Sequence, residues 1–160
     1  MRTVLDAYYR LLRLLITVLM GLLIVPVSLQ ILSRYTGLIP RYIWTEEVAR
    51  FCFIWIIMIG SMIAVRDGSH FDVDVLPRPR TNWGRGVSLL VVHTAMLLMA
   101  LVFSWYGYGF AQFGYIQNSE LAGINMLSIY ISFPLAGVTW VVFLLERFVE
   151  DVRIMREPQS

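Results

Sequence analysis

Two short polar stretches interrupt a chain in which 58% of the 160 residues are hydrophobic. The first places Glu46, Glu47 and Arg50 at the start of an apolar run, and the second, residues 66–77, follows that run directly. A charge at the centre of a membrane span costs roughly 2.5 to 3.5 kcal/mol, so charges beside such a run need a partner or a function. The chemistry to consider is therefore ion pairing at the first stretch and metal or haem ligation at the second.

The first stretch has two interpretations. With Thr45 as a helix N-cap, both glutamates fall in the first turn, where the helix dipole stabilises each by about 0.3 to 1 kcal/mol. Arg50 follows them by four and three residues, so either can pair with it on one helix face. Gln30 and Arg34, one turn apart at the end of the preceding apolar run, can complete a polar patch. Arg50 is followed by only about 22 Å of apolar helix, which places it at or slightly below the interface and favours an ion-pair network over a solvated helix end.

The second stretch reads R-D-G-S-H-F-D-V-D-V-L-P and alternates polar with apolar residues, as an extended segment with one polar edge does. His70, Asp72 and Asp74 share that edge, but three candidate ligands without a fourth make a metal site the weaker interpretation. We expect Gly68 to end the preceding helix and the apolar edge to lie against the membrane surface or a partner. No metal or other cofactor is expected.

Both stretches belong to an all-α integral membrane protein with four transmembrane helices. A mean hydropathy of +0.69 and 15% charged residues point away from an ordinary soluble domain. Four apolar runs can cross about 30 Å of hydrocarbon, and the first is expected to be a retained anchor rather than a cleavable signal. We predict one membrane domain over residues 1–160, with a short connection at 66–86 and spans at about 11–32, 48–65, 87–110 and 126–145.

The arginines predict the orientation in the membrane. All thirteen basic residues are arginine, and ten of them precede the first span, join the second to the third, or follow the fourth. Arg34 and Arg41 lie in loops on the other side. The positive-inside rule then places both termini and the 66–86 connection in the cytoplasm.

Prolines and small residues predict how the spans pack. Pro26 and Pro134 fall inside the first and fourth spans, where a lost backbone hydrogen bond can kink a helix and neighbouring helices must cover it. Small residues at four-residue spacing allow helices to approach closely. These are Gly60 and Ala64, Gly107 and Ala111, and Ser128, Ser132 and Ala136.

Three motifs in order resemble a known family: W-T-E-E-V-A-R from Trp44, F-I-W-I-I-M-I-G-S from Phe53 and R-D-G-S-H-F-D-V-D from Arg66. The chain resembles, over nearly its whole length, the small DctQ-like membrane subunit of tripartite ATP-independent periplasmic (TRAP) transporters. The resemblance implies a subunit, without enzymatic activity, of an ion-driven importer of organic acids in the bacterial inner membrane, and sodium is the expected coupling ion. The residues expected to bind partners are Arg34 and the motif residues Trp44, Glu46, Glu47, Arg50, Gly60, His70 and Asp74.

The resemblance also implies the partners. A larger, many-span membrane subunit is expected to carry the substrate and ion sites and to move as an elevator, while the small subunit braces its fixed scaffold. A periplasmic substrate-binding protein delivers the cargo, and loops 34–44 and 115–125 are candidates for docking it. Membrane lipids are the remaining partner, and no nucleic acid is expected.

Two other classes of function remain open. A haem-bearing anchor of a membrane oxidoreductase would need His70 and His93 as axial ligands, but these lie at different depths, and His93 alone is interpreted as a packing residue. A self-contained channel or exporter would need a charge in the middle of the membrane, which the spans lack. No serine–histidine–acid arrangement or phosphate-binding glycine loop indicates independent catalysis.

Overall fold

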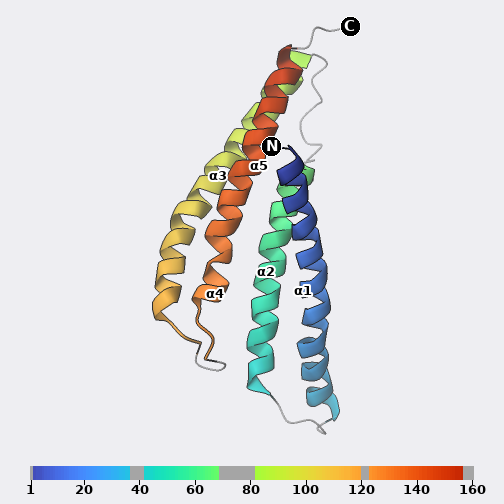
Figure 1. Cartoon of the computed structure of the whole chain (residues 1–160), viewed down its shortest axis with the longest axis vertical. Coiled ribbons are helices and arrows are strands. Elements are labelled where there is room, and N and C mark those ends of the chain that lie inside the picture. Colours follow the sequence, from blue (N-terminus) through green and yellow to red (C-terminus); the bar gives the residue numbers. More distant parts are fainter. Residues whose placement is uncertain (1, 37–41, 69–81, 120–122, 157–160) are drawn as a thin grey trace.

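The chain folds into long helices that run up and down (Figure 1). The computed structural model describes residues 2–36, 42–68, 82–119 and 123–156. The helices are α1 (Arg2–Thr36), α2 (Ile43–Asp67), α3 (Asn82–Ile116), the single turn α4 (Leu127–Tyr130) and α5 (Ser132–Arg156). Four segments, with α4 and α5 counted together, are long and apolar enough to cross a membrane. The predicted fold class, an all-α membrane protein with four spans, is confirmed.

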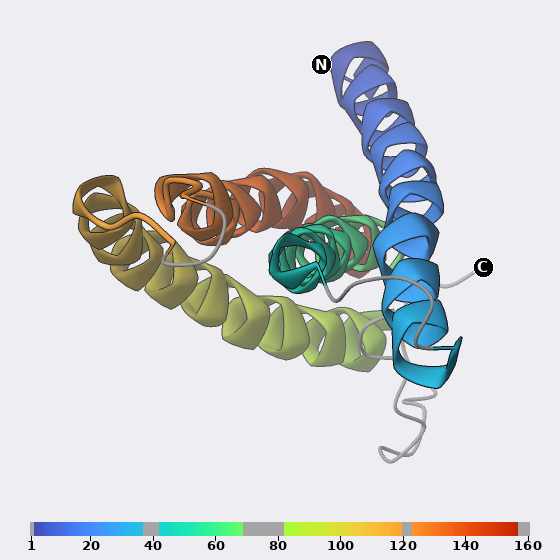
Figure 2. The ribbon, with the colours of Figure 1, turned by 90° about the horizontal axis from the view of Figure 1, so that it is seen from below.

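The helices form two hairpins that diverge toward one end. α1 packs on α2, α3 packs on α5, and the two pairs meet through α2 and α5 (Figure 1). Viewed from below, α2 lies between α1 and α5, with α3 on the far side of α5 (Figure 2). We call the end where the hairpins meet, with residues 2–13, 62–68 and 143–156, the terminal end. The opposite end, with residues 30–36, 42–50, 115–119 and 123–130, is the hairpin end.

The two edge helices leave most of their surface uncovered. In the most apolar windows of α1 and α3, only 6% of residues are buried within the chain, against 39% in the window over α4 and α5. This follows from the arrangement, because α1 and α3 each contact mainly one neighbour. Both edges are therefore open to lipid or to another protein.

The two prolines inside the spans have different effects. α1 runs without a break through Pro26, which is buried. Pro134, in contrast, follows the break between α4 and α5 at Ile131, because its ring nitrogen cannot donate to the carbonyl of Tyr130. The helical hydrogen bonds resume with Leu135 N donating to Ile131 O at 3.3 Å. A break in the helix thus accompanies Pro134 and not Pro26.

Glycines bring α3 and α5 into close contact. A Cβ atom at Gly107 would lie 2.8 Å from the nitrogen of Pro134, and one at Gly137 would lie 2.7 Å from the nitrogen of Ser104. Such contacts would push the helices apart, so both positions need a residue without a side chain. The close approach expected at Gly107 is confirmed, whereas Gly137 was not among the predicted small residues.

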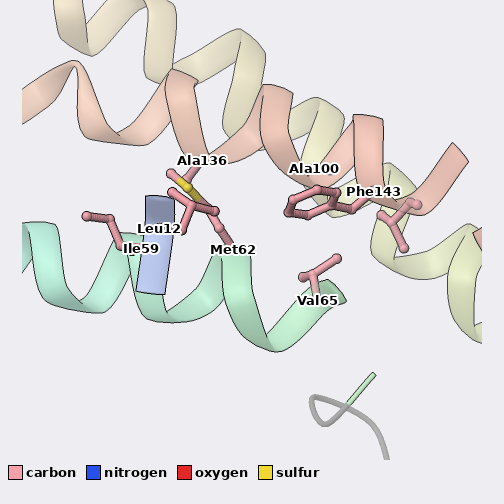
Figure 3. Packing of buried hydrophobic residues seen from close by; sticks show 8 residues of the cluster. Leu12, Ile59, Met62, Val65, Ala100, Ala136 and Phe143 are labelled. Atoms are coloured by element: carbon pink, nitrogen blue, oxygen red, sulfur yellow. The ribbon is translucent and has the colours of Figure 1, made fainter. Parts of the chain in front are cut away.

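The apolar core lies between α2 and α5 and extends toward the terminal end (Figure 3). Lipid is as apolar as these side chains, so their packing stabilises the bundle mainly through dispersion contacts rather than through exclusion from water. All four long helices contribute to the cluster: Leu12 from α1, Ile59, Met62 and Val65 from α2, Ala100 from α3, and Ala136, Phe143 and Leu144 from α5.

Candidate functional site

The charged start of α2 begins earlier than the sequence suggested. α2 starts at Ile43, and Tyr42 in an extended conformation occupies the N-cap without a capping side chain. Thr45, expected as the N-cap, is instead buried inside the first turn, and its hydroxyl donates to the carbonyl of Tyr42 at 2.6 Å. The N-cap prediction is therefore wrong, because the backbone of Tyr42 already starts the helix. Glu46 still lies in the first turn.

Glu46 and Arg50 form an ion pair on the surface of α2. Nη2 of Arg50 lies 3.2 Å from Oε1 of Glu46, one helical turn away. The two side chains are 60% and 65% exposed, so water or lipid headgroups reach both. Phe53 and Ile57 continue the same exposed stripe along the helix, since residues three and four apart share a face. We call these four residues the α2 stripe.

Glu47 points away from that pair and toward the other hairpin. Its carboxylate accepts a hydrogen bond from the hydroxyl of Ser119, in the loop after α3. Its second oxygen is buried and has no hydrogen-bond partner in the described part of the chain. Nearby in α2, the indole N–H of Trp55 donates to the carbonyl of Ser128 at 2.9 Å. These contacts join α2 to the loop after α3 and to α4.

The predicted polar patch is therefore divided. Arg50 pairs with Glu46, four residues before it, whereas Glu47 accepts a hydrogen bond from Ser119 instead. In the described residues, no hydrogen bond or ion pair connects Gln30 or Arg34 with these charges. The side-chain nitrogen of Gln30 is buried, and Arg34 is exposed at the end of α1.

The remaining predicted residues lie in different surroundings. Trp44 is half exposed, with its ring centre 6.2 Å from that of Tyr42. Gly60 faces α1, where Cδ1 of Ile16 lies 3.5 Å from the place of a Cβ atom, so it contributes to packing. His70 and Asp74 lie outside the described residues, as does the rest of the predicted extended segment.

A second polar cluster, which the sequence reasoning missed, lies at the terminal end. Arg66 near the end of α2 donates to the carboxylate of Asp6 and to the carbonyl of Leu5 in α1. Its guanidinium carbon lies 4.9 Å from the ring centre of Tyr9 and 5.3 Å from that of Phe143. The sequence placed Arg66 in the cytoplasmic connection and in the third family motif, and predicted no contact for it. The available signal was a charged pair, Arg-Asp, directly after an apolar run and at the same end as the tyrosines near the N-terminus.

Further contacts around this cluster join α1, α2 and α5. Asp67 accepts a hydrogen bond from the hydroxyl of Tyr9 at 2.5 Å and lies 3.7 Å from the guanidinium of Arg13. Arg147 of α5 donates to the backbone carbonyl of Arg66. α2 ends at Gly68 in the left-handed conformation, with φ of 71°, which confirms the predicted helix end.

The histidine and carboxylate residues do not form a ligand site in the described part of the chain. No group of three or more His, Cys, Asp or Glu side chains is close enough to hold a metal ion there. His93 in α3 packs against Phe148 of α5, with ring centres 6.2 Å apart in an edge-to-face arrangement. The packing role expected for His93 is consistent with this contact.

Comparison with known proteins gives the family. Residues 22–154 match the profile of the DctQ component of tripartite ATP-independent periplasmic transporters. The chain belongs to this family. The predicted resemblance to a TRAP small membrane subunit is thereby confirmed. Because it also has four apolar helices, the chain is a multi-pass protein of the bacterial inner membrane.

Proteins that are named as TRAP transporter permease subunits resemble this chain. The sialic acid TRAP transporter small permease protein SiaQ of Vibrio cholerae is 27% identical, with 86% of this chain and 79% of SiaQ aligned. A putative TRAP transporter small permease protein of Haemophilus influenzae is 23% identical over 69% of this chain and 67% of its own length. The isethionate TRAP transporter permease protein DctMQ of Oleidesulfovibrio alaskensis is 27% identical over 80% of this chain. The chain spans only about a fifth of the length of DctMQ, since the aligned part covers 21% of it.

Proposed function

We propose that this TRAP small permease subunit braces a larger transport subunit of a sodium-driven importer of organic acids. The match to the DctQ component over residues 22–154 is the observation that carries this proposal. The chain aligns with one part of the much longer DctMQ, which supports a second, larger membrane partner. The names of the relatives mention isethionate and sialic acid, both organic acids, and support that class of cargo.

The interior of the bundle supports bracing rather than a transport path of its own. The fully buried polar residues of the described part are serines and threonines, and the two largely sheltered charges, Glu47 and Arg66, lie near opposite ends of α2 rather than at its middle. An ion or an organic acid crossing a membrane needs polar or charged groups along its path. The open edges formed by α1 and α3 offer surface for packing against another protein instead.

The α2 stripe is the proposed contact with the large subunit at the periplasmic side. An ion pair followed by two apolar side chains combines charge complementarity, which selects a partner, with area for packing. Trp44 and Arg34 lie at the same end and extend the proposed surface. Glu47 and Gly60 act indirectly, by holding α2 against the other hairpin and against α1.

The hairpin end is the proposed periplasmic side, where the substrate-binding protein docks. The arginine distribution supports a cytoplasmic terminal end, so the hairpin end faces the periplasm and the substrate-binding protein. Loops 34–44 and 115–125 are the proposed docking region at that end. His70 and Asp74, in the cytoplasmic connection, are proposed contacts of the large subunit.

Complex formation tests the proposal directly. A tagged chain purified gently from its native membrane should bring a many-span protein with it, identified by mass spectrometry. Arg50→Ala should lower the yield of this complex at least about fivefold, equivalent to about 1 kcal/mol of interface energy. Exchanging the charges, with Glu46→Arg and Arg50→Glu together, should partly restore it.

A control variant, Arg10→Ala, accompanies this test. Arg10→Ala removes an exposed arginine at the terminal end, where its described side-chain contact is with the carbonyl of Asp6 in its own helix, and should leave the yield unchanged. Equal yields and equal uptake for Arg50→Ala and the unmodified chain would remove the α2 stripe from the interface. Recovery of haem- or flavin-containing subunits in place of a many-span protein would contradict the transport function itself.

A further inference from the structure

Arg66 contacts two other helices from one position near the end of α2. Its guanidinium donates to the carbonyl of Leu5 and to the carboxylate of Asp6, both in α1. The same group lies 4.9 Å from the ring centre of Tyr9 in α1 and 5.3 Å from that of Phe143 in α5. Only 16% of its side chain is exposed. A single side chain therefore holds α1 and α5 against the end of α2.

The two residues after Arg66 add separate contacts at the same joint. Asp67 binds the hydroxyl of Tyr9, which fixes the ring that packs on Arg66. Gly68 leaves space for Arg147, whose Nη2 would lie 3.2 Å from a Cβ atom there. Arg147 uses that space to donate to the carbonyl of Arg66. In the triplet Arg-Asp-Gly, the arginine and the aspartate therefore each make contacts with α1, and the glycine leaves the space that Arg147 occupies.

We propose that Arg66 is a positioning residue that sets the angle between the α1–α2 hairpin and α5. A guanidinium is planar and can donate within its plane while its faces pack on rings, whereas the ammonium of a lysine cannot do both. The contacts of Arg66 with α1 and with Phe143 of α5 use both properties. We call Arg66 and its partners Asp6, Tyr9, Phe143 and Arg147 the Arg66 clamp.

The length of α2 converts a small rotation at the clamp into a large movement at the hairpin end. From Arg66 back to Ile43, the start of α2, the helix is about 35 Å long at about 1.5 Å per residue. A rotation of about 10° at the clamp would therefore move the start of α2 by about 6 Å. Movement of that size would separate Glu47 from Ser119 and displace the α2 stripe.

The angle can be measured in the isolated chain. Spin labels attached through Tyr35→Cys in α1 and Ile116→Cys in α3 would report it, because both positions are 84% exposed at the hairpin end and belong to different hairpins. The buried native cysteine is removed by Cys52→Ala. Pulsed electron paramagnetic resonance in lipid nanodiscs then gives the distribution of distances between the labels.

We expect Arg66→Gln to shift or broaden that distribution by about 6 Å, as a rotation of about 10° requires. Arg66→Lys keeps the charge but not the planar group, so the change should be intermediate. Arg10→Gln removes an exposed arginine whose described contact is within its own helix, and should match the unmodified distribution. An unchanged distribution in folded Arg66→Gln would overturn the proposal.

Two further measurements distinguish a failure of this proposal from misfolding of the variant and from a failure of the proposed function. If Arg66→Gln does not yield folded protein, Tyr9→Leu removes one ring and one hydroxyl contact of the same clamp, and an unchanged distribution there would equally overturn the proposal. The role of the angle in bracing rests on the proposed function, but the distances do not. Failure of the unmodified chain to bind a large subunit would contradict that function and leave the distance result standing.

Discussion

The two ends of the bundle use charged residues in opposite ways. At the terminal end, Arg66 and Asp6 are 60 positions apart in the chain, and the arginine is mostly buried between helices. At the hairpin end, Arg50 and Glu46 are four positions apart on one helix, and both are mostly exposed. The first pair joins elements, whereas the second leaves their arrangement unchanged and remains accessible to another molecule.

A charge beside a membrane span therefore has two separate uses in this bundle. A hydrogen bond to a charged group contributes about 1.5 to 3 kcal/mol when it is sheltered, and a cation–π contact adds about 0.5 to 1 kcal/mol. An exposed pair one turn apart on a helix contributes only about 0.3 to 0.5 kcal/mol. By these magnitudes the Arg66 clamp stabilises the fold, and the Glu46–Arg50 pair is available for recognition.

Removal of Arg66 should have the largest effect on stability. Arg66→Ala leaves the carbonyl of Leu5 and the carboxylate of Asp6 without their described donor, and should lower the free energy of unfolding by about 2 to 3 kcal/mol. Arg50→Ala, on the same helix, should lower it by less than about 0.5 kcal/mol. Unfolding of the isolated chain in mixed detergent micelles, followed by circular dichroism, measures both. Equal losses would show that the two ends do not differ as described.

The glycine at the end of α2 should have the next largest effect. Gly68→Ala places a side chain at φ of 71° and 3.2 Å from Nη2 of Arg147, and should cost about 1 to 2 kcal/mol of unfolding free energy. Gly123→Ala is the matched control, because Gly123 has φ of 66° but no atom within 4 Å of the added Cβ. The excess cost at Gly68 over Gly123 measures the crowding of Arg147. No excess would mean that Arg147 moves aside freely.

The contact of Glu47 with Ser119 should contribute a smaller amount. Glu47→Gln keeps the size of the side chain but weakens a charge-assisted hydrogen bond, and should cost about 1 kcal/mol. A double-mutant cycle with Ser119→Ala isolates the contact, since the combined variant should lose less than the sum of the two single variants. Strictly additive losses would show that the two side chains act independently.

The long helices could be predicted because the sequence features that indicate them are local. Apolar runs, arginine placement and the glycine at the end of α2 each depend on neighbours in the chain, and the four spans and Gly68 were predicted from them. Pro134 lies beside a real break, but Pro26 does not, since whether a helix tolerates proline depends on what covers the freed carbonyl.

The sites were predicted less well because their contacts join distant residues. Nothing in the spacing of Arg66 indicates Asp6 or Phe143, which approach it only after three helices have packed. An ion pair between Arg50 and either glutamate was predicted from their spacing, and the structure has it with Glu46. Glu47 was assigned to the same network, but its direction is set by the loop containing Ser119.

The smallest expected effect concerns salt and the Glu46–Arg50 pair. Glu46→Gln should cost less than about 0.5 kcal/mol at about 0.1 M salt, and the cost should vanish near 1 M, where the screening length falls from about 10 Å to about 3 Å. The loss in Arg66→Ala should persist at both concentrations, because that guanidinium is only 16% exposed. Unfolding measured at the two salt concentrations compares them. A cost for Glu46→Gln that survives high salt would mean that the pair stabilises the fold, and would weaken its assignment to partner binding.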